Sequence, residues 1–126
     1  MTWSWGMALY QSDTACAVAD GKIGFVVPAS MNGMDLSALV ASCTGAVGTT
    51  GTMDVQVRRL RAGAEVNMLS VALTIDSGEW TNLTAETGYT IDTDNDDLAT
   101  GDVIFFDVDG VHTTPAEGLT ITATAA

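Results

Sequence analysis

The residues best suited to chemistry are carboxylates crowded into one short stretch. Five aspartates and one asparagine lie between residues 92 and 102, and they supply the hard oxygen ligands that Ca²⁺ prefers. The pattern DTDNDD has the opening spacing of a calcium-binding loop, but the glycine and the distal glutamate of such a loop are out of register. The ordinary interpretation is turn chemistry, with Asp94 or Asn95 capping a short turn. We expect no cofactor, and the calcium candidates are Asp92, Asp94 and Asp96.

The single histidine, His112, follows Gly-Val and precedes Thr-Thr-Pro, a context typical of a turn. A Ser-His-Asp arrangement would need this residue, but the sequence has no G-x-S-x-G elbow. We therefore expect a solvated loop histidine and no catalytic residues, and the protein is not predicted to be an enzyme. An alternative is that three copies of His112 meet on a trimer axis and bind a metal ion.

Three of the four basic residues, Arg58, Arg59 and Arg61, lie within four positions. One interpretation is that they pair with strand carboxylates such as Asp107 and Asp109. The other is a contact patch for an acidic partner or for sister subunits, because arginine is enriched at interfaces.

Large aromatic side chains gather at the beginning of the chain. Trp3 and Trp5 alternate, so in a strand both point to one side, and Tyr10 follows them. Aromatics near a free terminus either fold back on the domain or dock on a neighbour. We predict that Trp3, Trp5 and Tyr10 contact a neighbouring protein or sister subunits.

A second aromatic pair, Trp80 and Tyr89, flanks a polar stretch that contains Asn82 and Glu86. Exposed aromatics beside such residues are typical of sugar-binding β domains. The favoured arrangement is nevertheless a buried Trp80 that caps the domain, because a large ring gains most from burial.

These residues must be held by strands, since no segment has a sustained 3.6-residue apolar period. Short segments, either apolar throughout or alternating between apolar and polar residues, are separated by residues typical of turns. Several of these segments are predicted to be strands that bury one face or both faces. The predicted strands cover the first ten residues and residues 22–27, 35–44 (covered on both faces), 53–57, 68–75 (with Leu69, Val71, Leu73 and Ile75 inward), 89–91, 103–108 and 119–125. About eight strands predict an all-β, single-domain β-sandwich, most simply a jelly roll. Residues 1–21 form an N-terminal arm and first strand, a candidate docking segment, and residues 22–126 form the sandwich.

Composition narrows the function classes. The 126 residues carry a formal net charge of −12, so phosphate backbones would repel the chain and we expect no nucleic acid partner. No stretch approaches the roughly 20 apolar residues of a membrane span, and the N-terminus lacks a signal-peptide pattern. We expect synthesis in a cytoplasm without export through a signal sequence, and no membrane partner. Cys16 and Cys43 are too few for a disulfide framework, and a buried free thiol is the ordinary interpretation of Cys43.

The runs IGFVVPASMNGMDLSALVASCTGAVGTTGTMDVQVRRL, LTIDSGE and ATGDVIFFDVDGV–TPAEGLTITATA resemble a recurrent module of tailed-bacteriophage virion proteins. The resemblance covers roughly Lys22 to Ala125. It implies a small jelly-roll-like domain that associates as a homotrimer. A stand-alone chain of this kind best fits a capsid decoration protein, which binds the major capsid protein on the outer surface of the head and stabilises the shell. The alternative is a tail-fibre or receptor-binding tip domain that recognises a host surface glycan.

Overall fold

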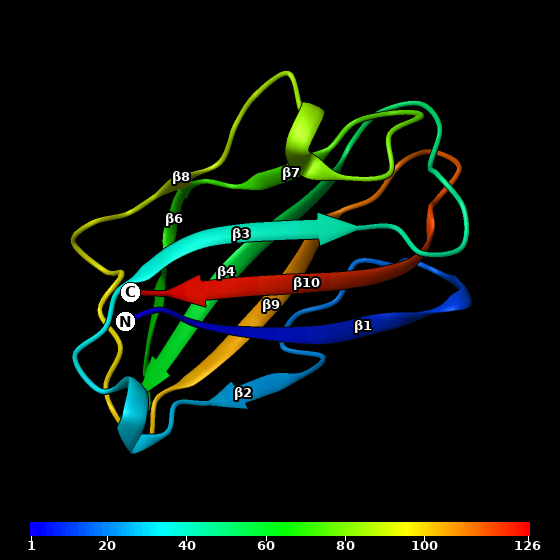
Figure 1. Cartoon of the computed structure of the whole chain (residues 1–126). Helices are drawn as coiled ribbons and strands as arrows, with labels where there is room; N and C mark the ends of the chain where they lie inside the picture. Colours follow the sequence, from blue (N-terminus) through cyan, green and yellow to red (C-terminus); the bar gives the residue numbers. More distant parts are fainter.

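A computed structural model describes residues 1–126 and contains strands, two single 3₁₀ turns and no α-helix (Figure 1). The strands are β1 (Trp3–Ala15), β2 (Gly24–Val26), β3 (Leu36–Ser42), β4 (Met53–Arg61), β5 (Ala64–Asn67), β6 (Leu69–Val71), β7 (Leu73–Ile75), β8 (Thr90–Ile91), β9 (Val103–Gly110) and β10 (Glu117–Ala125). The 3₁₀ turns are η1 (Ala29–Met31) and η2 (Asn82–Thr84). The predicted all-β class is confirmed, with two strands more than the eight expected.

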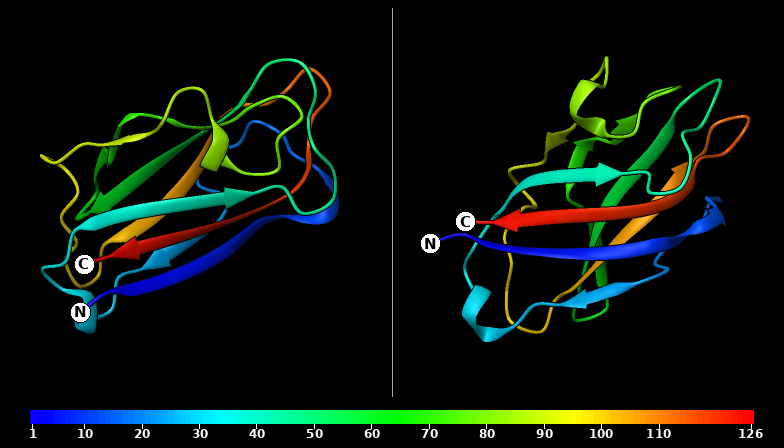
Figure 2. Two further views of the ribbon diagram at one scale, coloured as in Figure 1. Left: turned by 45° about the horizontal axis from the view of Figure 1, so that its top comes forward. Right: turned by 45° about the vertical axis from the view of Figure 1, so that its right-hand side comes forward.

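The strands form two main layers that cross obliquely (Figure 2). One sheet has the order β1-β10-β3, and the other has the order β2-β9-β4-β5, with β7 also paired to β4. Every pairing between these strands is antiparallel. The first strand pairs with the last and the second with the last but one, which is the nested order of a jelly-roll sandwich. A separate two-stranded ladder joins β6 to β8.

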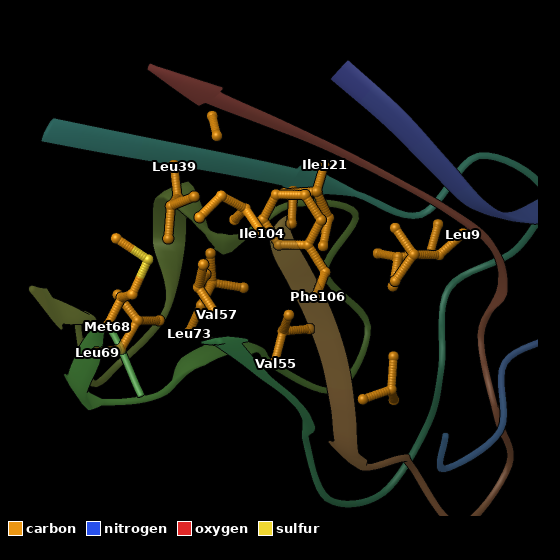
Figure 3. Close-up of a cluster of buried hydrophobic side chains, with 14 of the residues drawn as sticks. Leu9, Leu39, Val55, Val57, Met68, Leu69, Leu73, Ile104, Phe106 and Ile121 are labelled. Carbon is orange, nitrogen blue, oxygen red and sulfur yellow. The ribbon is translucent and has the colours of Figure 1, made fainter. Parts of the chain in front are cut away.

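The core is the space between the two layers (Figure 3). Strand β4 supplies Met53, Val55 and Val57 on one face, as the strict alternation of its sequence predicts. In the close-up, side chains of the first sheet, including Ile121 and Leu39, point toward Phe106 of the second. Twenty-five buried residues make up this one continuous cluster, so the chain folds around a single core.

The two edges of the β1-β10-β3 sheet differ. The outer edge of β3 is capped by the loop after β7: the Leu39 N–H donates to the Tyr89 hydroxyl at 2.9 Å, and the Ala41 N–H donates to Asn82 Oδ1 at 2.8 Å. Strand β1 pairs with β10 alone, so its other edge is open. Residues 1–21 therefore include a 13-residue strand of the sandwich itself, held along β10 from Trp3 to Ala15.

Two expectations for the strands were wrong. Residues 68–75 form two strands, β6 and β7, and Val71, the last residue of β6, is 40% exposed where an inward position was predicted. β6 pairs with β8, whereas β5 before it and β7 after it pair with β4, and this change of partner breaks the alternation. Strand β3 was expected to be covered on both faces, but Val40 is exposed, because the second sheet covers only one face of β3.

The β4–β5 hairpin was not predicted. Arg61 pairs with Ala64, which leaves Ala62 and Gly63 as a two-residue loop. Both loop residues have positive φ, 49° and 80°, which is the combination of a type I′ turn. This turn usually begins with asparagine or aspartate, so the alanine at position 62 concealed it from sequence reasoning.

Candidate functional site

The arginines of β4 are used inside the molecule. Arg58 forms two hydrogen bonds with the Asp107 carboxylate, from Nε at 2.8 Å and from Nη2 at 3.1 Å, and the Gly21 N–H donates to the same carboxylate at 2.7 Å. The Arg58 guanidinium also lies over the Phe105 ring, 4.5 Å from its centroid. The predicted pairing with Asp107 is thus present, whereas Asp109 makes no ion pair.

Arg61 and Arg59 reach carboxylates on a different segment, the loop that precedes β9. Arg61 forms two 2.8 Å hydrogen bonds with Asp102, from Nε and Nη2, and a longer pair with Asp97. Arg59 is buried and donates to the Asp97 carboxylate and backbone carbonyl. The hydrogen bonds from Arg61 hold the pKa of Asp102 below its usual range, and they raise the pKa of Arg61.

An open polar depression of about 480 Å³ lies beside Arg58. Its lining includes three aspartates, Asp20, Asp107 and Asp109. The pKa of Asp109 is raised, first by partial burial of its carboxylate and then by the nearby negative charges of Asp20, Asp107 and Asp54. The depression therefore combines one paired arginine with an excess of negative charge. Its lining residues are Asp20, Gln56, Arg58, Glu65, Asn67, Asp107 and Asp109.

The acidic stretch is organised by local hydrogen bonds. Asp92 accepts from the Asp94 N–H at 3.1 Å and from the Asn95 side chain at 2.8 Å, an arrangement typical of an Asx turn. Asp102 caps the next turn by accepting from the Ala99 N–H at 2.8 Å. No three carboxylate, histidine or cysteine side chains of the chain lie close enough together to hold a metal ion. The calcium candidates Asp92, Asp94 and Asp96 thus do not converge, and the capping residues are Asp92 and Asp102 where Asp94 or Asn95 was expected.

The aromatic residues of β1 occupy three different environments. Trp3 is 42% exposed. Trp5 is half-buried and stacks on Phe25 of β2, with ring centroids 4.5 Å apart. Tyr10 is buried, donates its hydroxyl proton to the Ala17 carbonyl at 2.7 Å, and carries the Lys22 ammonium over its ring at 3.7 Å. Trp3 is therefore the aromatic residue of this strand that is free to contact another molecule.

Several large apolar side chains are exposed on β1 and in the segment of β2. We name the exposed side chains of Trp3, Ile23 and Val26 the β1–β2 patch; in the same two strands, Trp5 and Phe25 stack on each other. A second apolar region lies on the opposite edge of the same sheet. There a groove of about 360 Å³ is lined mainly by Val40, Leu83 and Tyr89 with smaller neighbours.

Trp80 is half exposed (50%), so the expectation that it caps the sandwich from a buried position was wrong. Its segment runs along the outer edge of β3, where the Cys43 N–H donates to the Trp80 carbonyl at 2.7 Å, and this path leaves the ring outside the core. The side chains of two polar residues of the same segment, Asn82 and Tyr89, accept hydrogen bonds from the backbone of β3. Glu86 remains exposed beside them.

His112 is 2% exposed, so the expectation of a solvated loop histidine was wrong. Neither of its ring nitrogens has a hydrogen-bond partner, and the ring packs so closely on Gly48 that a Cβ there would overlap it. Cys16 and Cys43 are buried and unpaired with each other, and burial raises the pKa of the Cys16 thiol to about 11. These three residues belong to the packed interior.

No helix of this chain is long and apolar enough to cross a membrane. Comparisons with known proteins found no matching family model, no matching curated protein and no matching solved structure. The residues and surfaces of the chain itself therefore carry the functional argument.

Proposed function

We propose that this protein is a structural component of a bacteriophage virion, a capsid decoration protein that binds the major capsid protein on the outer surface of the head. The observation that supports this proposal is the β1–β2 patch, in which Trp3, Ile23 and Val26 expose apolar surface on a chain of net charge −12. Exposed apolar side chains are suited to contact with another protein, and tryptophan is enriched among the residues that dominate binding energy.

The proposed mechanism is mechanical. In this proposal three chains form a homotrimer, and many homotrimers bind the shell. Each one buries apolar surface across a boundary between capsomers and so raises the free energy needed to open the shell. Trp3 is the central contact in this proposal, because it is the exposed tryptophan of β1, whereas Trp5 is held by its stack on Phe25. The side chains of Arg58 and Arg59 are largely covered by the chain itself, which leaves Arg61 as the arginine with the most exposed side chain for an outside contact.

A second candidate function is favoured by Trp80. Its exposed ring lies close in sequence to Glu86, as in a sugar-binding platform on a receptor-binding tip domain. Against this role, the side chains of Asn82 and Tyr89 already bond to the backbone of β3, so fewer polar groups are free to orient a glycan. The capsid role therefore ranks first.

The two roles are separated by a matched pair of tryptophan variants, Trp3→Ala and Trp80→Ala. Both residues are exposed and lie on opposite edges of the sandwich, so neither change should unfold the protein. Purified variants are added to phage shells that lack the protein, and bound protein is measured after sedimentation. We expect Trp3→Ala to lose binding and Trp80→Ala to keep it. The decoration role would be overturned if the wild-type protein did not bind shells but bound a glycan array, and if Trp80→Ala abolished that glycan binding.

A further inference from the structure

Most of one sheet of this protein carries no charged side chain. All 16 acidic residues lie outside three segments, residues 3–8, 36–42 and 118–126, and so do all four basic residues. These segments are the first six residues of β1, the whole of β3, and β10 without its first residue, Glu117, and together they make up most of one sheet of the sandwich. Its outer surface is the layer nearest the viewer in Figure 1.

The side chains on this outer surface are small and uncharged. Thr122 at the centre and Val40 beside it are exposed, whereas Ile121 and Leu39, their neighbours in sequence, point into the core. We name this surface the neutral face and define it as Ser4, Gly6, Ala8, Ala38, Val40, Ser42, Thr120, Thr122 and Thr124. Short side chains lose little conformational entropy when they are covered, so a flat face of this kind is suited to sheet packing.

The neutral face continues into an open strand edge. Leu39 and Ala41 of β3 direct their backbone N–H groups away from β10. Because backbone groups alternate in direction along antiparallel strands, the residues of β10 opposite them direct theirs toward β1. The backbone groups of Trp3, Trp5 and Met7 then face β10. The N–H and C=O groups of the intervening residues, Ser4, Gly6 and Ala8, then face outward. None of them has a partner elsewhere in the chain.

Proteins usually protect such an edge with charge, proline, a bulge or a covering loop. The opposite edge of this sheet has its covering loop, in which Tyr89 and Asn82 satisfy the donors of β3. From Trp3 to Ala8, β1 has no charge, no proline and no break in its register with β10. One edge of this sheet is thus covered within the chain, whereas the β1 edge is left available for pairing with another chain.

We propose that the neutral face and the adjoining β1 edge are the surface through which copies of this chain associate. Each chain carries a net charge of −12, and its three arginines are already paired, so two copies repel each other across most of their surfaces. The neutral face is where that repulsion is smallest. A basic partner would be drawn instead to the carboxylate-rich loops and to the second sheet.

The inference deepens the assembly part of the proposed function, because it names the surface on which the association rests. Its test places one charge at the centre of the face. Thr122 is exposed and its side chain makes no hydrogen bond, so Thr122→Glu and Thr122→Lys should both fold. Thr87→Glu is the matched control, since Thr87 is also exposed but lies on the acidic loop before β8.

Sedimentation equilibrium gives the mass of each protein, and circular dichroism confirms the fold. We expect the wild type and Thr87→Glu to form oligomers of the 13.0 kDa chain. Either charge at position 122 should raise the dissociation constant by about 100-fold or more, because an unpaired charge would be covered. Added salt should strengthen wild-type association, since it screens the residual repulsion.

A monomeric wild type would overturn the inference, as would folded Thr122 variants that keep the wild-type mass. Association that weakens with salt would also overturn it, because that result indicates ion pairs. Failure of the decoration role is recognised separately by sedimentation with shells. A wild-type oligomer that dissociates on Thr122→Glu but never binds shells would support the neutral face and refute the capsid role.

Discussion

Loss of Arg61 should destabilise the protein far more than its position near the surface suggests. Its partner Asp102 is 2% exposed and accepts two hydrogen bonds from Arg61 and one from the Ala99 N–H. The variant Arg61→Met leaves this buried carboxylate with the Ala99 N–H as its only remaining donor. Removing one partner of a fully buried pair costs about 3–5 kcal/mol. Arg61 itself is partly exposed, so we expect the lower value of about 2–3 kcal/mol.

The corresponding change in melting temperature follows from the size of the chain. An unfolding entropy of about 2.1 cal/mol/K per residue over 126 residues converts that loss into a decrease of about 8–11 °C. The measurement is thermal unfolding followed by circular dichroism at pH 7. Glu65→Gln is the matched control, because it removes the more exposed ion pair with Arg58 and should cost less than about 0.5 kcal/mol.

A double variant tests the stated cause. Arg61→Met combined with Asp102→Asn removes the unpaired charge but keeps an oxygen that can accept from the Ala99 N–H. We expect it to recover most of the lost stability. If Arg61→Met unfolded at the same temperature as Glu65→Gln, or if the double variant recovered nothing, the argument that a stranded carboxylate sets the cost would be refuted.

Three further predictions concern stability. Gly45→Ala should destabilise by at least about 2 kcal/mol in urea unfolding, because its Cβ would overlap the backbone of β1, whereas Gly88→Ala has open space and should change little. Ala62→Asn should stabilise by about 0.5–1 kcal/mol, since asparagine tolerates the positive φ of the β4–β5 turn; a lower urea midpoint would contradict this. The pKa of Asp102 is lowered by Arg61, so its contribution to stability is present above about pH 3.9 and is lost as pH falls through the lower folded pKa. Asp102→Asn should therefore flatten the acid side of the stability profile, measured as urea midpoints between about pH 2 and 5.

Local sequence patterns predicted the strands whose two faces have different environments. The alternation in Met53–Val57 placed β4 correctly, because apolar and polar residues alternate with a period of two along a strand that buries only one face. Prediction was poorer where the partner of a strand changes, as at Val71, or where one sheet lacks a cover on its outer side, as at Val40. Those features depend on which segments lie on either side of a strand.

The same distinction applies to the candidate site residues. The sequence showed that a cluster of arginines faced a large excess of carboxylates, and it suggested Asp107 as a partner, which the fold provides. It gave no way to find that Arg61 reaches Asp102, 41 positions away, since a bidentate contact between two segments requires the packed geometry. His112 and Trp80 exchanged their expected environments for the same reason: burial depends on what packs above a residue.

The sequence by itself determined that this protein is an acidic all-β sandwich, because strand periodicity, turn residues and net charge are local or additive properties. The tertiary structure alone decided where the charges lie relative to the sheets. Residues 3–8, 36–42 and 118–126 are uncharged in the sequence, but only hydrogen bonding between β1, β10 and β3 joins them into one neutral face. A surface made from distant segments exists only after those segments pair, so only the fold could reveal it.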